Sequence, residues 1–238
     1  MTSWLGSTDD GTGGSRAVHL PLGREAYQAT HERQLRLHAL RVQGAIPDTV
    51  LSVEHDPVFT IGRRGSRENL LVPPDTLRRE GIAVYDVERG GDITYHGPGQ
   101  VVLYPIIDLR GHGRDLARYV RNLEQTVIDF LAAVEVTAQR RPGLPGVWVG
   151  ERKIAAVGVH VKRWVTLHGL ALNVRVNPEH FAMINPCGLR IEVVSLDDLV
   201  LRRYSLDEVV SGLLGAMSPL FGWRIIDQVE AEPLGRRP

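Results

Sequence analysis

The stretch PGVWVGERKIAAVGVHVKRWVTLHGLALNVRVNPEHFAMINPCG, residues 145–188, carries the strongest fold signal in this chain. Three apolar runs within it predict β-strands: Val147–Val149, Ile154–Val161 and Val165–Val174. Gly150, Glu151 and Arg152 separate the first two runs and predict a hairpin turn directly before Lys153. The stretch therefore predicts neighbouring strands that form part of a β-sheet.

Two residue types that are rare in the chain occur in the same stretch. Cys187 is the only cysteine, and Lys153 and Lys162 are the only lysines among 28 basic residues. A cysteine thiolate is a nucleophile, and a lysine can give up its proton in a protein whereas an arginine cannot. One hypothesis is that Lys153 and Cys187 meet in space as a catalytic pair. The alternative is a buried, inert cysteine and a lysine that serves only the turn.

Periodicity and turn residues predict further elements on both sides of this stretch. We expect strands at Ala17–Leu22, Thr49–Glu54, Val58–Ile61, Ile82–Val87, Val101–Leu109 and, at a sheet edge, Trp223–Ile226. We expect helices at Arg24–Gln43, Asp75–Glu80, Leu116–Val134, Pro178–Ile184 and, after a capping box at Ser205–Glu208, up to Leu220. Helices that interrupt strands irregularly favour an α+β fold with a mixed sheet.

Composition and length narrow the function classes. Residues 1–15 are rich in Gly, Ser, Thr and Asp and predict a flexible tail, which leaves residues 16–238 as a single domain. The formal net charge is zero, so no nucleic-acid partner is expected. No apolar run reaches the roughly 18 residues of a membrane span, and the start has no secretory pattern. The sequence predicts a cytoplasmic protein without a membrane partner.

The segment RGGDITYHGPGQ, residues 89–100, contains four glycines and a proline. This composition disfavours a strand interior and favours a loop whose backbone closely approaches a ligand. The segment matches neither a Walker A loop nor a dinucleotide-binding fingerprint. His96 is either a proton carrier or a residue that fixes the loop through hydrogen bonds.

Metal and hydrolase motifs are absent from the sequence. The nine histidines form no H-E-x-x-H pattern, and His160 and His168, eight residues apart, are not a typical ligand pair. No G-x-S-x-G elbow is present. We therefore expect no metal and no other cofactor.

Five segments together resemble the lipoyl(octanoyl) transferase family: EHDPVFTIGRR (54–64), RGGDITYHGPGQVVLY (89–104), PGVWVGERKIAAVG (145–158), LHGLALNV (167–174) and INPCG (184–188). The resemblance extends from about residue 17 to 220. It implies the mixed sheet flanked by helices that is shared with biotin and lipoate protein ligases.

The resemblance also implies an activity, partners and site residues. Enzymes of this family transfer octanoyl groups from octanoyl-acyl carrier protein to a lysine of lipoyl domains. The acceptors are the apo lipoyl domains of 2-oxoacid dehydrogenase complexes and the glycine cleavage H protein. By resemblance, Cys187 carries the acyl thioester and Lys153 lowers its pKa or moves its proton, with His168 and Asn185 as supporting residues. Substrate contacts are implied for Arg89, Gly90, Gly91, Asp92, Ile93, Thr94, Tyr95, His96, Ala156, Val157, Gly158, Gly169, Leu170 and Ala171.

Three alternatives remain open at the level of the sequence. An ATP-dependent lipoate or biotin ligase would share the fold without requiring Cys187. A catalytically silent carrier-binding module would bind but not transfer, and a cysteine hydrolase lacks a recognisable Cys-His pattern. Either a carrier-docking surface or an ordinary solvated face accounts for the arginines at positions 63, 64, 67, 140 and 141.

Overall fold

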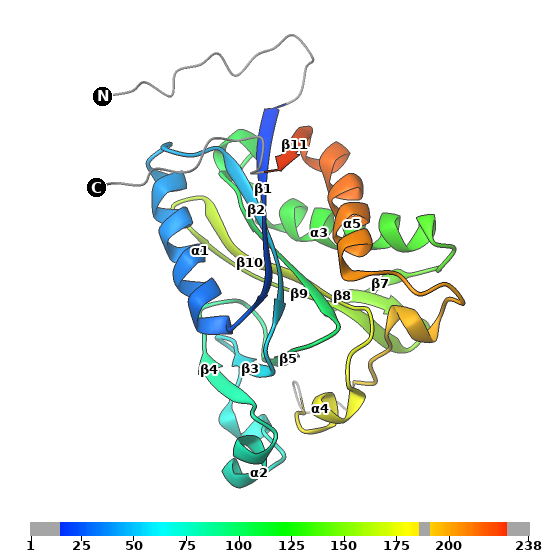
Figure 1. Ribbon diagram of the computed structural model, residues 1–238. Coiled ribbons are helices and arrows are strands. Elements are labelled where there is room, and N and C mark those ends of the chain that lie inside the picture. The colour runs from blue at the N-terminus through cyan, green and yellow to red at the C-terminus, as the bar shows by residue number, and fades with distance from the viewer. Residues whose placement is uncertain (1–14, 186–190, 228–238) are drawn as a thin grey trace.

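A mixed eight-stranded sheet forms the centre of the molecule (Figure 1). The computed structural model describes residues 15–185 and 191–227. In spatial order the strands are β11 (Trp223–Asp227), β1 (Ser15–Glu25), β2 (Asp48–His55), β6 (Gln100–Ile106), β10 (Val165–Asn173), β9 (Arg152–Lys162), β8 (Leu144–Val149) and β7 (Gln139–Arg141). Strand β1 is parallel to both of its neighbours, and the other pairs are antiparallel. This confirms the α+β fold class and the expected edge strand at Trp223.

Helices cover both faces of this sheet (Figure 1). Helix α1 (Tyr27–Val42) lies on one face, and helices α3 (Leu116–Ala133) and α5 (Leu206–Phe221) lie on the other. The alternation of side chains along a strand divides the core accordingly. In β6, Val101 and Leu103 pack with the α3 and α5 residues, whereas Val102 and Tyr104 pack on the α1 side.

A second, three-stranded sheet lies beyond one end of the large sheet, with the order β4 (Ala83–Asp86), β3 (Val58–Ile61) and β5 (Ile93–His96). Helix α2 (Pro74–Arg79) and helix α4 (Pro178–Ala182) lie near it (Figure 1). Short 3₁₀ helices occupy Arg67–Asn69, Leu109–His112 and Leu196–Asp198.

Two sequence expectations need correction, and one strand was not expected. Residues Ile93–His96, expected in a loop, form β5, because the glycines flank this run and leave ITYH as β-branched and aromatic residues. Ser15, expected in the tail, begins β1 and donates its backbone N–H to Gly222 O at 3.1 Å. Strand β7 was not expected, because its three residues are polar and carry no period-two pattern. Residues 1–14 of the expected tail lie outside the described residues.

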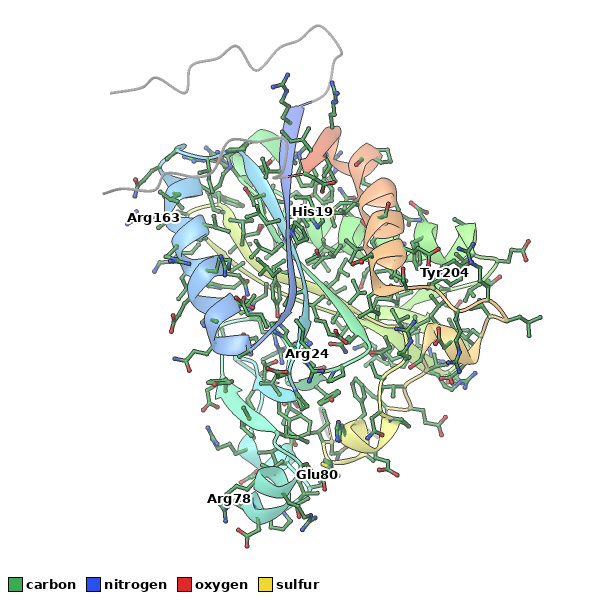
Figure 2. All side chains as sticks on the ribbon, in the orientation of Figure 1. His19, Arg24, Arg78, Glu80, Arg163 and Tyr204 are labelled. Atoms are coloured by element: carbon green, nitrogen blue, oxygen red, sulfur yellow. The ribbon has the colours of Figure 1, made fainter. Side chains whose placement is uncertain are left out.

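Hydrogen bonds between side chains also connect the strands near the sheet edge. His19, labelled in Figure 2, lies in β1 between its two neighbours. One ring nitrogen lies 2.6 Å from Asp227 Oδ1 of β11, and the other lies 2.8 Å from Ser52 Oγ of β2. These contacts join the edge strand to the sheet.

Within the described residues, none of the helices combines the length and apolar character needed to cross a bilayer.

The capping box predicted at the start of α5 is present and gives a stability prediction. Ser205 Oγ accepts the Glu208 N–H at 3.2 Å, and the Glu208 carboxylate accepts the Ser205 N–H at 2.8 Å. Ser205→Ala should lower the free energy of unfolding by about 1 kcal/mol, because the first turn loses an acceptor. Urea denaturation measures the change, with Ser211→Ala on the exposed face of the same helix as the control. Equal losses in both variants would contradict a capping role.

Candidate active site

A cavity of about 550 Å³ lies between the glycine-rich segment, strands β9 and β10, and the residues that flank α4. The sequence-predicted residues that line it are Arg89, Gly90, Gly91, Asp92, Ile93, Thr94, His96, Lys153, Ala156, Val157, Gly158, His168, Gly169, Leu170 and Ala171. These residues come from three separate parts of the chain. The fold therefore brings together most of the candidate site.

Tyr95 and Asn185 are not among the residues that line this cavity. Tyr95 contacts the rings of Phe59 and Phe181, and its hydroxyl lies 2.7 Å from His180 Nδ1. Strand alternation in β5 turns the Tyr95 side chain to the face opposite to its neighbours Thr94 and His96, which line the cavity. Asn185 instead donates its backbone N–H to Asn69 O at 2.9 Å.

Cys187 lies outside the described residues, in the gap 186–190. On either side of this gap, Ile184 and Ile191 both line the cavity, as does Val193. The backbone of Lys153 pairs with the chain just after the gap: its N–H donates to Glu192 O at 2.8 Å, and its C=O accepts from Val194 N at 3.0 Å. The described residues that flank Cys187 in sequence therefore share the cavity with Lys153.

The lysine side chain extends past an aromatic ring and a glycine. Lys153 Nζ lies 5.5 Å from the centroid of the Trp148 ring, and Trp148 is buried, so the contact is a cation–π interaction when the amine is protonated. A Cβ atom on Gly146 would lie only 2.6 Å from Lys153 Cε and 2.4 Å from Ala155 O. Position 146 therefore has to be a glycine for the lysine to take this course.

Arg89 holds the glycine-rich segment in place. Its guanidinium is buried and donates to Thr60 Oγ1 at 2.9 Å, to Thr60 O at 2.5 Å and to Gly90 O at 3.0 Å. Burial lowers the pKa of this guanidinium from its ordinary value. Gly158 of β9 lies against the Arg89 side chain, where a Cβ would be 3.2 Å from Cδ. Arg89 thus connects β3 to the cavity wall.

Asp92 contacts the segment before Cys187 through Asn69. Its carboxylate accepts hydrogen bonds from Asn69 Nδ2 at 2.9 and 2.8 Å and from the Ile93 N–H at 2.6 Å. Asn69 in turn accepts the Asn185 N–H. Since Asp92 and Asn185 are both tied to Asn69, these contacts fix the chain immediately before the gap.

Two buried histidines contribute neutral imidazoles. His96 Nδ1 donates to Gln100 Oε1 at 2.7 Å, which leaves its Nε2 as an acceptor. His55 Nε2 accepts the Tyr104 hydroxyl at 2.9 Å. Burial, with a smaller contribution from His55, lowers the pKa of His96 to about 3, and burial lowers the pKa of His55 to about 4. His96 is therefore uncharged at neutral pH, and its hydrogen bond to Gln100 fixes the glycine-rich segment.

Sequence reasoning missed several residues that line the cavity. They are Tyr27, Thr60, Tyr104, Leu144 and Trp148, together with Leu116 and Val120 of α3. Tyr104 and Trp148 lie within the quoted motifs, so their residue type was a usable signal. Tyr27 and the α3 residues carry no such signal, because their part in the cavity depends only on how the helices pack.

Residues 26–218 match the model of the lipoyl protein ligase A/B catalytic domain. The chain is 54% identical over 188 residues to an octanoyltransferase of Solibacter usitatus, which covers 79% of this chain and 85% of the relative. It is 46% identical over 221 residues to an octanoyltransferase of Syntrophobacter fumaroxidans, with 91% and 97% covered.

Solved structures show the same fold at low sequence identity. A lipoate-protein ligase A bound with ATP superposes with a TM-score of 0.68 at 17% identity, covering 90% of this chain and 88% of that one. A putative lipoate protein ligase from T. acidophilum with bound lipoic acid gives a TM-score of 0.67 at 17% identity, with 90% and 88% covered. A biotin protein ligase from Aquifex aeolicus gives 0.51 at 14% identity, with 87% and 70% covered. These similarities confirm the expected fold.

The close approach at Gly146 predicts an unusual cost for a single methyl group. Gly146→Ala places Cβ against Lys153 and the Ala155 carbonyl at a φ of +117°, so we expect a loss of about 3 kcal/mol in the free energy of unfolding. Gly150→Ala is the matched control, because its φ is +58° and the space around it is open. It should cost only about 1 kcal/mol. Denaturation of both variants measures the difference, and equal costs would mean that Lys153 does not depend on Gly146.

The buried histidines predict how stability depends on pH. Both have folded pKa values below the ordinary 6.5, so the unfolded chain binds more protons between about pH 6.5 and pH 4. The free energy of unfolding should therefore have its full value above pH 6.5 and should decrease as the pH falls below 6.5. His55 alone contributes a loss on the order of 3 kcal/mol by pH 4. His55→Gln should give a shallower decrease in urea denaturation between these pH values; an unchanged slope would contradict a neutral buried His55.

Proposed function

Because this chain belongs to the family of lipoyl protein ligase A/B catalytic domains, among the octanoyltransferases, we propose that it transfers an octanoyl group to a lysine of lipoyl domains through a thioester on Cys187. The donor in this proposal is octanoyl-acyl carrier protein. One observation carries the proposal: Lys153 lines the same apolar cavity as Ile184 and Ile191, the described residues on either side of the Cys187 segment.

The cavity suits a fatty acyl chain. Ala156, Val157, Leu170 and Ala171 line it with small and apolar side chains from β9 and β10. Burial of a methylene contributes about 0.8 kcal/mol, so the six methylenes of an octanoyl chain contribute about 5 kcal/mol. This free energy favours octanoyl over shorter acyl groups by roughly tenfold for every two methylenes removed.

The first half-reaction exchanges one thioester for another. The Cys187 thiolate attacks the octanoyl carbonyl carbon, the new C–S bond forms, and the C–S bond to the carrier breaks. The carrier leaves as a thiolate and takes up a proton from the Lys153 ammonium, which becomes a neutral amine. Since one thioester replaces another, this step is close to thermoneutral and needs no nucleotide.

The second half-reaction forms an amide. The target lysine amine attacks the Cys187 thioester, a C–N bond forms, and the C–S bond breaks. The amine proton passes to the neutral Lys153, and Cys187 departs as a thiolate, which restores the starting pair. An amide is more stable than a thioester, so the step runs downhill. Lys153 acts first as a cation that favours the thiolate and then as the proton carrier.

The candidate docking arginines are not equivalent in the structure. Arg140 donates to Glu124 at 3.0 Å and to Gln125 at 2.8 Å, and Arg141 pairs with Glu151 and lies over Trp148. Arg64 lines the cavity, and its backbone N–H donates to Gly91 O at 3.1 Å. Arg64 is therefore the best placed of the five to meet an acidic carrier protein at the cavity, a role whose rate contribution falls with salt.

A mass measurement separates this mechanism from an ATP-dependent ligase. The chain is incubated with octanoyl-acyl carrier protein without nucleotide, and the intact mass is determined. We expect one octanoyl adduct that maps to Cys187 and is lost in Cys187→Ser. A chain that forms no adduct but octanoylates lipoyl domains from free octanoate and ATP would instead be a ligase, and binding without any transfer would make it a silent carrier-binding module.

The role of Lys153 is tested with the two lysines of the chain. Lys153→Arg keeps a cation but cannot cycle a proton, so octanoyl transfer to a lipoyl domain should fall at least ~100-fold. Lys162→Arg, at the far end of β9, is the matched control and should retain nearly full activity. Single-turnover rates and circular dichroism of both variants are compared. A Lys153→Arg variant that is folded and fully active would limit Lys153 to an electrostatic role.

A further inference from the structure

Two histidines and a glutamate meet at the cavity wall. His31 comes from α1, Glu88 lies directly before Arg89, and His168 lies in β10 directly before Gly169. Glu88 Oε1 is 3.1 Å from His31 Nε2 and 3.5 Å from His168 Nε2. All three donor atoms lie within 4.8 Å of one another. We propose that His31, Glu88 and His168 form a binding site for a zinc ion.

The spacing of the donor atoms fits zinc. Zinc binds imidazole nitrogen and carboxylate oxygen at about 2.0–2.1 Å in tetrahedral geometry, which places neighbouring donor atoms about 3.3 Å apart. The two separations from Glu88 Oε1, 3.1 and 3.5 Å, lie on either side of this value, and the two imidazole donor atoms lie within 4.8 Å of each other. Two imidazoles with one carboxylate are a ligand set that zinc uses, with a fourth position left for water or another ligand.

The state of His168 is a second, independent observation. This residue is only 2% exposed, and its Nε2 makes no hydrogen bond to any group in the described part of the chain. Its φ is +59°, a left-handed conformation that costs free energy in a residue with a side chain. The buried Nε2 of His168 faces the Glu88 carboxylate without a hydrogen bond to it. A metal ion bound between the two groups would satisfy both.

Neighbouring groups fix the orientation of both imidazoles. The His31 and His168 rings stack at 5.6 Å with an interplanar angle of 19°, and the His168 backbone N–H donates to Gln34 Oε1 at 2.9 Å. The ring of Tyr27 also stacks on the His31 ring, with a centroid distance of 5.7 Å. The ligands are thus held in place before an ion binds, as a metal site requires.

The sequence motifs could not reveal this group, because His31 and Glu88 are 57 residues apart and His168 lies on a third segment. The expectation of no metal came from ligand spacings within single segments. The inference does not depend on the proposed function. A bound ion would join α1, the segment before Arg89 and the strand before Gly169, and would thereby fix two walls of the cavity.

Zinc binding to the full chain tests the proposal directly. The protein is treated with a chelator and desalted, and ZnCl₂ is titrated in competition with a chromogenic chelator. The titration is made in Cys187→Ser as well as in the original chain, since a thiol is the other strong zinc ligand. We expect one ion per chain in both. Co²⁺ in place of Zn²⁺ should give visible d–d bands without a thiolate charge-transfer band.

The ligand variants and their control decide the assignment. His31→Asn and Glu88→Gln should weaken zinc binding at least ~100-fold, beyond the 10–100-fold effect of outer-shell partners. His38→Asn, two turns further along α1, should bind zinc as the original chain does. Circular dichroism of the metal-free variants confirms their folding. No bound zinc, zinc that disappears with Cys187→Ser, or unchanged affinity in folded His31→Asn would each overturn the proposal and leave a hydrogen-bonded His–Glu–His group.

Discussion

The backbone pairing of β9 is the constraint on which the rest of the site depends. Strand β10 pairs with β9 as far as Ala155, and residues 192–194 continue on the same side at Lys153. Strand β8 pairs with β9 on the other side, and further along Gly90 donates its N–H to Val159 O at 2.8 Å. One strand thus positions the lysine, the glycine-rich segment and the chain that returns after the gap. A shift of one residue in this register would turn Lys153 to the opposite face of the sheet.

Polar groups, not only apolar ones, hold the cavity walls together. Arg89, His96 and Asp92 are buried. Arg89 and Asp92 have hydrogen-bond partners in other segments, Thr60 and Asn69, and His96 bonds Gln100 at the end of its own segment. A buried polar group without a partner costs more free energy than a hydrogen bond contributes, so such contacts fix one arrangement strongly. This explains why a site assembled from distant segments keeps a defined geometry around a cavity that must remain accessible to substrate.

Helix α1 shows how buried polar side chains weaken the apolar periodicity by which a helix is recognised in the sequence. Its buried side chains include Thr30, Gln34 and His38 as well as Leu37, so it lacks the clear apolar stripe of α3. Thr30 bonds Glu25 at 2.6 Å, and Gln34 accepts the backbone N–H of His168. Natural sequences depart from simple binary patterns mainly near functional sites. In this protein the departure from the binary pattern is in α1, on the face that lies beside the cavity, where His31 meets Glu88 and His168.

The sequence by itself determined the fold class, the strands around residues 145–174, the amphipathic helix at 116–134, the capping box at Ser205 and fewer than half of the residues that line the cavity. These features depend on local periodicity, on turn residues or on motifs of contiguous residues. Only the tertiary structure decided that Tyr95 faces the core, that Ile93–His96 pair with β3, and that His31 reaches Glu88 and His168. The direction of a side chain in a short strand and the meeting of residues far apart in sequence depend on how the elements pack. Packing is set by the whole chain, so no local pattern encodes it.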